Sequence, residues 1–281
     1  MTARTATARS ILSPTSGFIA EAGFTHSLTP ARNCTFGCTY CYVPTMRVQG
    51  GLQPEDWRRW GQFTTFKTNA AQLLSREIRE GQRIYCSPLV DPYQPAEAQQ
   101  RAMPAILDAL LAAPPRVFAL QTRGPLILSD LKPLQALSQR TILRVSFSLT
   151  TNREEVRKLY EPHCAPTDER LDAIRELRAA GIETYATLAP LLPCDPEELA
   201  RLAIEASGRD LIGDPMHIRA TKPRGATTYA AALRVTSANH YNDWLRAEFQ
   251  EQLIARIDAA ARARGRTFVT GPRGFARLAR V

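Results

Sequence analysis

The chain has 281 residues, of which 44% are hydrophobic and 7% aromatic, so it can bury the core of one large α/β domain or of two small ones. Lysine and arginine outnumber aspartate and glutamate by 36 to 27, and the formal net charge of +9 favours a polyanionic partner such as nucleic acid. The alternative is a general surplus of arginine in an alanine- and arginine-rich proteome. No apolar run approaches the ~20 residues of a membrane span, and six clustered cysteines do not make a secreted disulfide framework. We therefore expect a cytoplasmic protein with no membrane partner.

The N-terminal segment has a distinctive composition. Residues 1–20 contain arginine, serine and threonine and no acidic residue, which is also typical of transit peptides. They lack the apolar stretch of a signal peptide. We interpret residues 1–23 as a short disordered tail that leads into the first strand.

Segments with strand and helix patterns alternate from residue 24 onward. The six segments with a strand pattern are 24–29, 83–89, 116–122, 141–149, 183–188 and 216–220. The segments with a helix pattern are 69–80, 97–113 with a kink at Pro104, 126–139, 152–160, 167–180 with Thr167 as N-cap, 196–207 and the long stretch 238–264. Residues 52–66 are expected to be irregular and rich in aromatic side chains, and residues 267–270 to form a last short strand.

This alternation predicts an α/β fold with a parallel sheet, because strand–helix–strand units join parallel strands through right-handed crossovers. Six such units that curl together form a partial (β/α)6 barrel, whose reactive groups gather at the carboxyl ends of the strands. A doubly wound sheet is the alternative, but no glycine-rich phosphate loop follows the first strand. We expect residues 24–237 to form the partial barrel, and residues 238–281 to form a C-terminal helix and a basic extension packed on it.

Three of the six cysteines fall within eight positions, as Cys34, Cys38 and Cys41 in a Cys-x3-Cys-x2-Cys pattern. Thiolates are soft ligands that suit zinc, copper(I) or iron–sulfur clusters, and so short a loop can aim three of them at one centre. A closed structural site needs four protein ligands, so three leave one metal position open for a substrate or cofactor. The alternative is a zinc knuckle completed by a distant residue such as His26 or Cys86.

This motif, with Tyr40 before its third cysteine, resembles that of the radical S-adenosylmethionine superfamily. Within the superfamily, the chain resembles the spore photoproduct lyase-like (DNA-repair photolyase-like) branch. It runs in order through SLTPARNCTFGCTYCYVP, VDPYQPAE, QTRGPLILSDL, VSFSLTT, YEPHCAPTDERLDAIRELRAAGI, LAPLLP and IRATKP. In the superfamily the three cysteines hold a [4Fe–4S] cluster, and S-adenosylmethionine chelates the fourth iron. The resemblance therefore implies both cofactors, a 5′-deoxyadenosyl radical, and an electron donor such as flavodoxin or ferredoxin.

The resemblance also implies residues that hold S-adenosylmethionine. Ser87 and Asp91 end the second strand, where the superfamily binds the methionine ammonium, and oxygen acceptors suit that group. Arg123 follows the third strand where the lyases have a lysine, and its guanidinium can bind the cofactor carboxylate bidentately. Tyr40 is implied to lie near the adenine. The structural alternatives are a turn-forming aspartate before Pro92, a surface arginine and a packing aromatic.

Two further strand ends carry candidates. Ser146 and Ser148 end the fourth strand and match a serine-bearing segment of the lyases, which implies a role at the cofactor carboxylate or ribose; strand serines that face solvent are the alternative. The lyases use a cysteine of the second strand as hydrogen donor to the product radical, and Cys86 ends that strand here. Counted back from Asp91, Cys86 is displaced from the lyase pattern, so it is either the donor or a small buried hydrophobe.

The remaining candidates have less specific patterns. Arg219 and Lys222 follow the sixth strand and match a basic stretch of the lyases, where they either line the substrate mouth or add surface charge. The other cysteines and the histidines show no ligand spacing and are interpreted as structural: Cys164, Cys194, His26, His163, His217 and His240.

Three functions fit these observations. The leading hypothesis is a radical S-adenosylmethionine enzyme that acts on a nucleic-acid lesion, as a lyase of the DNA-repair type. The second is radical modification of a peptide or small molecule, because related sequences need not share substrates. The third is a non-catalytic, metal-stabilised nucleic-acid-binding protein. Basic residues crowd the C-terminal third, at Arg262, Arg264, Arg266, Arg273, Arg277 and Arg280.

Overall fold

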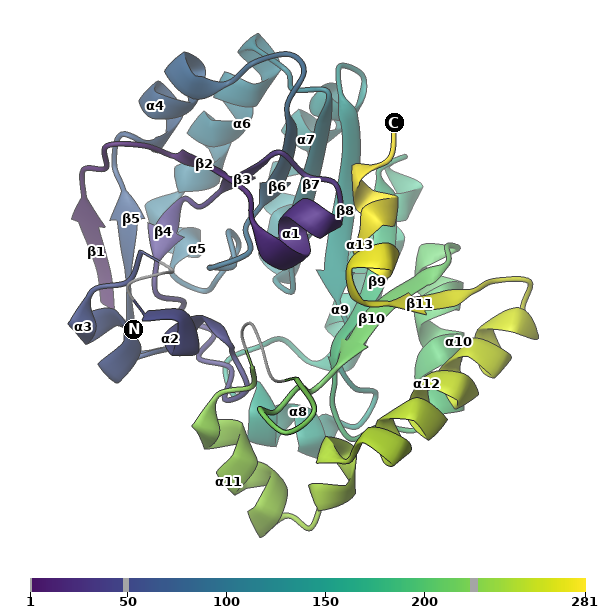
Figure 1. The fold of residues 1–281 in the computed structure, drawn as a ribbon. Helices are drawn as coiled ribbons and strands as arrows, with labels where there is room; N and C mark the ends of the chain where they lie inside the picture. The colour runs from purple at the N-terminus through teal and green to yellow at the C-terminus, as the bar shows by residue number, and fades with distance from the viewer. Residues whose placement is uncertain (1, 48–50, 223–226) are drawn as a thin grey trace.

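A computed structural model describes residues 2–47, 51–222 and 227–281 and has an eight-stranded sheet at its centre (Figure 1). The strand order is β11-β10-β9-β8-β7-β6-β3-β2. The strands are β2 (Leu12–Pro14), β3 (His26–Leu28), β6 (Arg83–Cys86), β7 (Val117–Thr122), β8 (Ile142–Ser148), β9 (Glu183–Leu191), β10 (Leu211–Pro215) and β11 (Phe268–Thr270). All neighbours from β3 to β11 pair in parallel, and only β2 runs antiparallel to its neighbour β3 in this sheet. The predicted α/β fold of the partial-barrel type is confirmed: the sheet is largely parallel, and its two end strands, β11 and β2, are not paired into a closed barrel.

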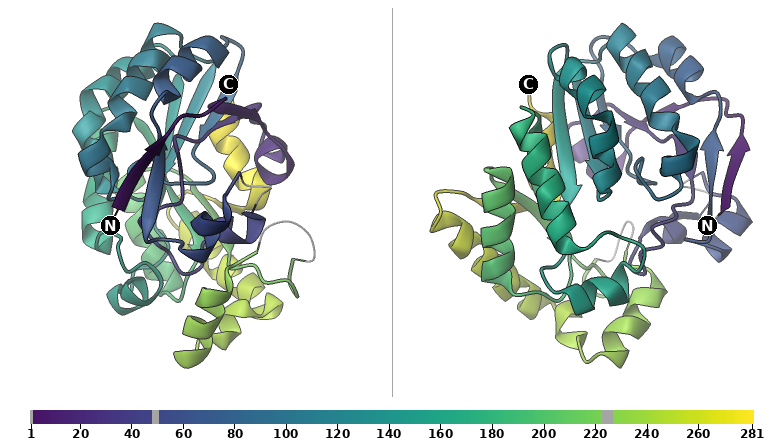
Figure 2. Two further views of the ribbon diagram at one scale, coloured as in Figure 1. Left: turned by 90° about the vertical axis from the view of Figure 1, so that its left-hand side faces the viewer. Right: turned by 180° about the vertical axis from the view of Figure 1, so that it is seen from behind.

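Helices cover one face of the sheet, here called the helix face (Figure 2, right). They are α4 (Ala70–Glu77), α6 (Ala102–Ala112), α7 (Leu131–Ser138), α9 (Thr167–Ala179) and α10 (Pro196–Ser207). Because side chains alternate along a strand, every second residue points into this layer. Ile84 and Cys86 from β6, Phe118 and Leu120 from β7, and Val145 from β8 are buried there in one cluster. This cluster is the main core.

The opposite face of the sheet, here called the α13 face, is covered by α1 (Gly17–Glu21) and α13 (Gly271–Ala279), which lie in front of it in Figure 1. Tyr85 and Ala119 point from the strands into this layer and are buried with Phe275 and Leu278 of α13. The ring of Phe18 on α1 meets the ring of Phe275 edge-on, with centroids 5.1 Å apart. The α13 helix was not expected from the sequence.

The N-terminal segment corrects one prediction. Residues 1–23 were expected to be a disordered tail, but β1 (Thr2–Ala6) pairs in parallel with β5 (Phe63–Lys67), and β4 (Ala31–Arg32) completes a three-stranded sheet. The sequence of β1, TARTA, has no run of large apolar residues, so its strand pairing rests on backbone hydrogen bonds that composition does not reveal. The segment 52–66 is also more regular than expected, because α3 (Pro54–Arg58) precedes β5.

The C-terminal part of the structure corrects two further predictions. The sixth parallel strand is β10 and not 216–220, since Leu211 and Ile212 are buried between β9 and β11. The expected helix 238–264 is shorter: α11 (Ala230–Ala238) ends where it was expected to begin, a 3₁₀ turn (Asn242–Leu245) follows, and α12 (Ala247–Arg262) covers the rest. His240, between α11 and the turn, adopts a left-handed backbone with φ 60°. No helix in the described ranges is long and apolar enough to cross a membrane.

Two local helix details also differ from expectation. The helix 97–113 is interrupted at Arg101, with φ 50°, into α5 (Glu97–Gln100) and α6, so Pro104 lies in the first turn of α6, where proline is tolerated. The N-cap position of α9 is Pro166, and Thr167 is the first helical residue; its hydroxyl donates to the carbonyl of Thr151 at 3.3 Å.

The packing of α13 against the sheet gives a test of the fold. A Cβ added at Gly274 would lie 2.2 Å from the carbonyl oxygen of Val269. We expect Gly274→Ala to lower the free energy of unfolding by about 1–3 kcal/mol through overpacking, as measured by urea denaturation. Gly81→Ala is the control, because no heavy atom lies within 4 Å of its added Cβ, and we expect a change within about 0.5 kcal/mol. Equal effects of the two substitutions would contradict the described packing of α13.

Candidate functional site

The cysteine loop, residues 33–42, follows β4 and is fixed from its first residue. Asn33 is fully buried with φ 62°. Its Oδ1 accepts hydrogen bonds from the backbone N–H of Cys34 at 2.7 Å and of Gly61 at 3.0 Å, and its Nδ2 donates to the carbonyls of Asp56 and Arg59 at 3.1 and 3.2 Å. Asparagine tolerates the left-handed backbone, so one residue both turns the chain and anchors it.

A buried glutamine fixes the middle of the loop. The Oε1 of Gln94 accepts from the backbone N–H and the hydroxyl of Thr35, at 2.7 and 3.0 Å, and its Nε2 donates to the hydroxyl of Thr64 at 3.2 Å. Sequence reasoning quoted Gln94 within the DPYQP segment but gave it no role. A glutamine between two prolines, Pro92 and Pro95, in the loop after β6 is the signal that could have revealed it.

The three loop cysteines have different surroundings. Cys34 and Cys38 are buried, Cys41 is partly exposed, and none of the six cysteines forms a disulfide in the described structure. Burial raises the pKa of Cys34 well above its usual value and raises that of Cys41 to about 12. The pKa of Cys38 is lowered, first by a hydrogen bond with Cys164 and then by the charge of Arg123.

A fully buried carboxylate joins this loop to the sheet. Glu161 follows α8 (Glu154–Tyr160) and is 0% exposed. Its Oε1 accepts from the Tyr40 hydroxyl, from Arg123 Nη1 at 2.6 Å and from the Thr150 hydroxyl at 2.9 Å, and its Oε2 accepts from Arg170 Nη2 at 2.5 Å. Burial would raise the pKa of Glu161, but the charges of Arg170 and Arg123 outweigh it and lower the pKa to about 2. Glu161 is therefore ionised and paired.

Arg123 is held between two carboxylates. Besides Glu161, it faces Asp91, whose Oδ2 accepts from the Arg123 backbone N–H at 2.8 Å and lies 4.0 Å from Nε. The Oδ1 of Asp91 accepts from the Thr122 hydroxyl at 2.7 Å. The Arg123 guanidinium lies 5.6 Å from the centre of the Tyr40 ring, and the side chain is 13% exposed. The alternative of a solvated surface arginine is therefore wrong.

The candidate serines all lie inside the protein. Ser146 and Ser148 are both 0% exposed, which rules out solvent-facing strand serines, and Ser87 is buried. The Ser146 hydroxyl bonds to that of Thr187 at 2.7 Å. The hydroxyl oxygens of Ser87 and Ser148 have no hydrogen-bond partner within the described part of the chain. Buried hydroxyls without partners are costly, so these two suit a polar ligand at the carboxyl ends of β6 and β8.

The remaining candidates lie outside this group. Cys86 is in the core of the helix face, on the opposite side of the sheet from Ser87, and burial raises the pKa of its thiol. This position argues against a hydrogen-donor role, which stays a prediction. His26 hydrogen-bonds to Thr25 at 3.0 Å, and Lys222 lies 5.8 Å from the ring of Phe18. The residues that follow Lys222, 223–226, lie outside the described ranges.

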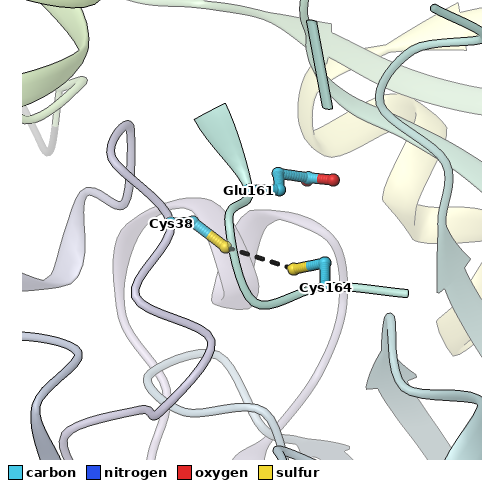
Figure 3. Close-up of side chains that lie close together, drawn as sticks. All are labelled: Cys38, Glu161 and Cys164. Atoms are coloured by element: carbon cyan, nitrogen blue, oxygen red, sulfur yellow. Dashed lines mark hydrogen bonds between the residues drawn. The ribbon is translucent and has the colours of Figure 1, made fainter. Parts of the chain in front are cut away.

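One thiol that sequence reasoning treated as structural contacts the loop. The Sγ of Cys164 lies 3.9 Å from the Sγ of Cys38, and both lie beside Glu161 (Figure 3). Ligand atoms of Cys38, Glu161 and Cys164 lie within 4.8 Å of one another. Both oxygens of Glu161 already accept hydrogen bonds from arginine, so we do not count it as a free metal ligand. Among the described residues, the group that the structure brings within metal-binding distance includes Cys38 but neither Cys34 nor Cys41.

The sequence and the fold are similar to those of known proteins. The family model described as the Radical SAM superfamily matches residues 28–205. The uncharacterized protein Rv2578c of Mycobacterium tuberculosis is 28% identical over 241 residues, covering 83% of this chain and 66% of that protein, so the chain spans slightly less than two thirds of its length. The uncharacterized protein MJ0683 of Methanocaldococcus jannaschii is 23% identical over 218 residues, covering 78% of this chain and 74% of that protein.

Among solved structures, spore photoproduct lyase complexed with dinucleoside spore photoproduct has a TM-score of 0.63 at 15% identity, and the match covers 95% of this chain and 81% of that chain. A mutant of the same lyase gives 0.62 at 16% identity, with the same two coverages. Likeness at such low identity shows the fold alone. Together with the family model, it confirms the resemblance inferred from the cysteine motif.

The buried carboxylate gives a test of the site's stability. We expect Arg170→Met to lower the free energy of unfolding by about 3–5 kcal/mol, because it leaves Oε2 of Glu161 buried without its main cation. The double variant with Glu161→Gln should cost less than the sum of the two single variants. Arg175→Met on the same helix is the control, because its pair with Asp172 is exposed, and we expect less than about 1 kcal/mol. Strictly additive costs in the cycle would contradict the described pairing.

Proposed function

We infer that this chain, which belongs to the radical SAM superfamily, binds a [4Fe–4S] cluster through Cys34, Cys38 and Cys41. We further infer that it binds S-adenosylmethionine at the carboxyl ends of β6, β7 and β8. When bound, these two groups supply a low-potential electron and the 5′-deoxyadenosyl radical. The protein contributes binding, orientation and exclusion of water. The observation that carries this proposal is the position of Arg123 beside the cysteine loop.

Arg123 suits a carboxylate ligand. Its Nη1 is taken by Glu161 and by the Tyr40 hydroxyl, and its Nη2 makes no hydrogen bond to any residue that the structure describes. Two carboxylates hold the guanidinium in place, so its free N–H groups are preorganised for one more oxygen ligand. We assign the methionine carboxylate of S-adenosylmethionine to these N–H groups.

The other polar groups complete the proposed cofactor site. Ser87 and Ser148 offer hydroxyls that have no partner among the described residues to the methionine and ribose ends of the ligand. Ser146 can also bind the ligand when its hydroxyl exchanges the hydrogen bond to Thr187 for one to the ligand. Asp91 supplies negative charge for the methionine ammonium. The hydroxyl of Tyr40 is used by Glu161, so its ring and backbone are the parts left for the adenine.

For the substrate we propose a nucleic-acid lesion, with the enzyme acting as a lyase of the DNA-repair type. The net charge of +9 favours a phosphate-bearing partner, and spore photoproduct lyase shares the fold. A damaged base would have to leave the helix to reach a buried radical site. An electron donor such as flavodoxin or ferredoxin is the expected protein partner.

Cofactor binding is tested by anaerobic reconstitution. We expect about four irons per chain and reductive cleavage of S-adenosylmethionine to methionine and 5′-deoxyadenosine, with neither in a Cys38→Ala variant. Arg123→Met should raise the Kd for S-adenosylmethionine about 10- to 100-fold, the cost of one charge-assisted hydrogen bond. Because this change also removes one of the two arginines that pair with Glu161, binding is compared only in folded protein that carries iron. Arg256→Met is the control, because its ion pair with Glu197 lies on the surface.

Zinc in place of iron, with no cleavage of S-adenosylmethionine, would contradict the radical hypothesis. It would favour the non-catalytic, metal-stabilised nucleic-acid-binding protein.

The substrate is tested with UV-damaged DNA that carries thymine photolesions. Under reducing conditions with S-adenosylmethionine, we expect the lesion content to fall with time, as measured by mass spectrometry of the digested DNA. Cys86→Ala should keep the full yield, since its thiol faces the helix-side core. If 5′-deoxyadenosine forms while the lesions persist, the substrate is instead a peptide or small molecule.

A further inference from the structure

The hydrogen bond between Cys38 and Cys164 can have only one donor once Cys38 binds a metal. Both thiols are buried, and their sulfur atoms lie 3.9 Å apart (Figure 3). Between two free thiols either sulfur can donate the hydrogen bond. A cysteine that holds iron is a thiolate and has no proton to give. With Cys38 bound to a cluster, Cys164 is the remaining donor of this pair.

The turn that carries Cys164 is held from both sides. Arg157 Nη1 donates to the carbonyl oxygens of Cys164 at 2.7 Å and of Glu161 at 3.1 Å, and the Cys164 backbone N–H donates to the Glu161 carbonyl at 3.0 Å. Arg170 Nε donates to the carbonyl of Ala165 at 2.9 Å. These bonds fix the backbone on each side of the thiol, so the contact with Cys38 is preorganised.

Other uses of the Cys164 thiol fit the structure less well. A disulfide needs sulfur atoms about 2.0 Å apart, far closer than this pair. A separate metal site would need Glu161, whose oxygens are paired with two arginines. The charges of Arg123 and Arg170 beside Glu161 would also repel a second cation.

We propose that Cys164 is a positioning residue that donates an S–H hydrogen bond to the Cys38 thiolate and thereby raises the reduction potential of the cluster. The inference rests on the proposed function. Reduction adds negative charge to the cluster and its thiolate ligands, so a hydrogen bond to a ligand sulfur stabilises the reduced form more than the oxidised form. Loss of this donor should make the cluster harder to reduce while leaving its three ligands in place.

The test is an anaerobic redox titration of the reconstituted protein, followed by electron paramagnetic resonance of the reduced cluster. In Cys164→Ala we expect about four irons per chain, as in the wild type, and a one-electron reduction equilibrium less favourable by about tenfold, which corresponds to a potential about 59 mV lower. Cys164→Val fills the volume of the thiol but has no hydrogen-bond donor, so it should lower the potential by about as much as Cys164→Ala. Cys164→Ser keeps a donor and should retain most of the wild-type potential.

Cys194→Ala is the matched control, because Cys194 is a buried thiol in the core of the helix face and should leave the potential unchanged. An unchanged potential in both the alanine and the valine variants, with the cluster intact, would overturn this inference alone. An equally large drop of the potential in the serine variant would also overturn it. Loss of iron in the alanine variant would overturn it too, because Cys164 would then be a metal ligand. A wild-type chain that binds no [4Fe–4S] cluster would instead overturn the proposed function, and this inference with it.

Discussion

The site depends on one buried negative charge, the carboxylate of Glu161. A carboxylate without water is unstable unless cations and hydrogen-bond donors replace the solvent, and Glu161 has both. The four groups that supply them come from the cysteine loop, from the ends of β7 and β8, and from α9. None of them can shift without uncovering the charge, so this carboxylate ties the cysteine loop to the sheet and to α9.

Polarity changes along the α13 face in the direction of the strands. Near the amino ends, Val117 and Ala119 of β7 pack with apolar side chains of α1 and α13. Further along, Gln121 accepts a hydrogen bond from the Tyr85 hydroxyl, and Ser146 bonds to Thr187. The α13 face is thus apolar near the amino ends of the strands and polar near their carboxyl ends. A ligand with charged ends would bind at the carboxyl ends.

The sequence predicted the features that are local. The cysteine spacing, the buried runs of β7 and β8, and α10 follow from residues close together in the chain. The missed features depend on distant partners. Glu161 lies 38 residues from Arg123, and Gln94 lies 59 residues from Thr35, so no local pattern connects them. The strand β1 and the helix α13 were missed for the same reason, since their partners β5 and α1 lie far along the chain.

The contact between α1 and α13 joins segments that a ribosome makes at widely separated times. The strands between them can pair as they emerge, but the α13 face is not covered until α13 has been synthesised. Closing so long a loop is slow, because the chain loses conformational entropy before the contact between α1 and α13 can stabilise it. During synthesis the apolar side chains on the α13 face therefore stay exposed to water and to chaperones until α13 packs on them.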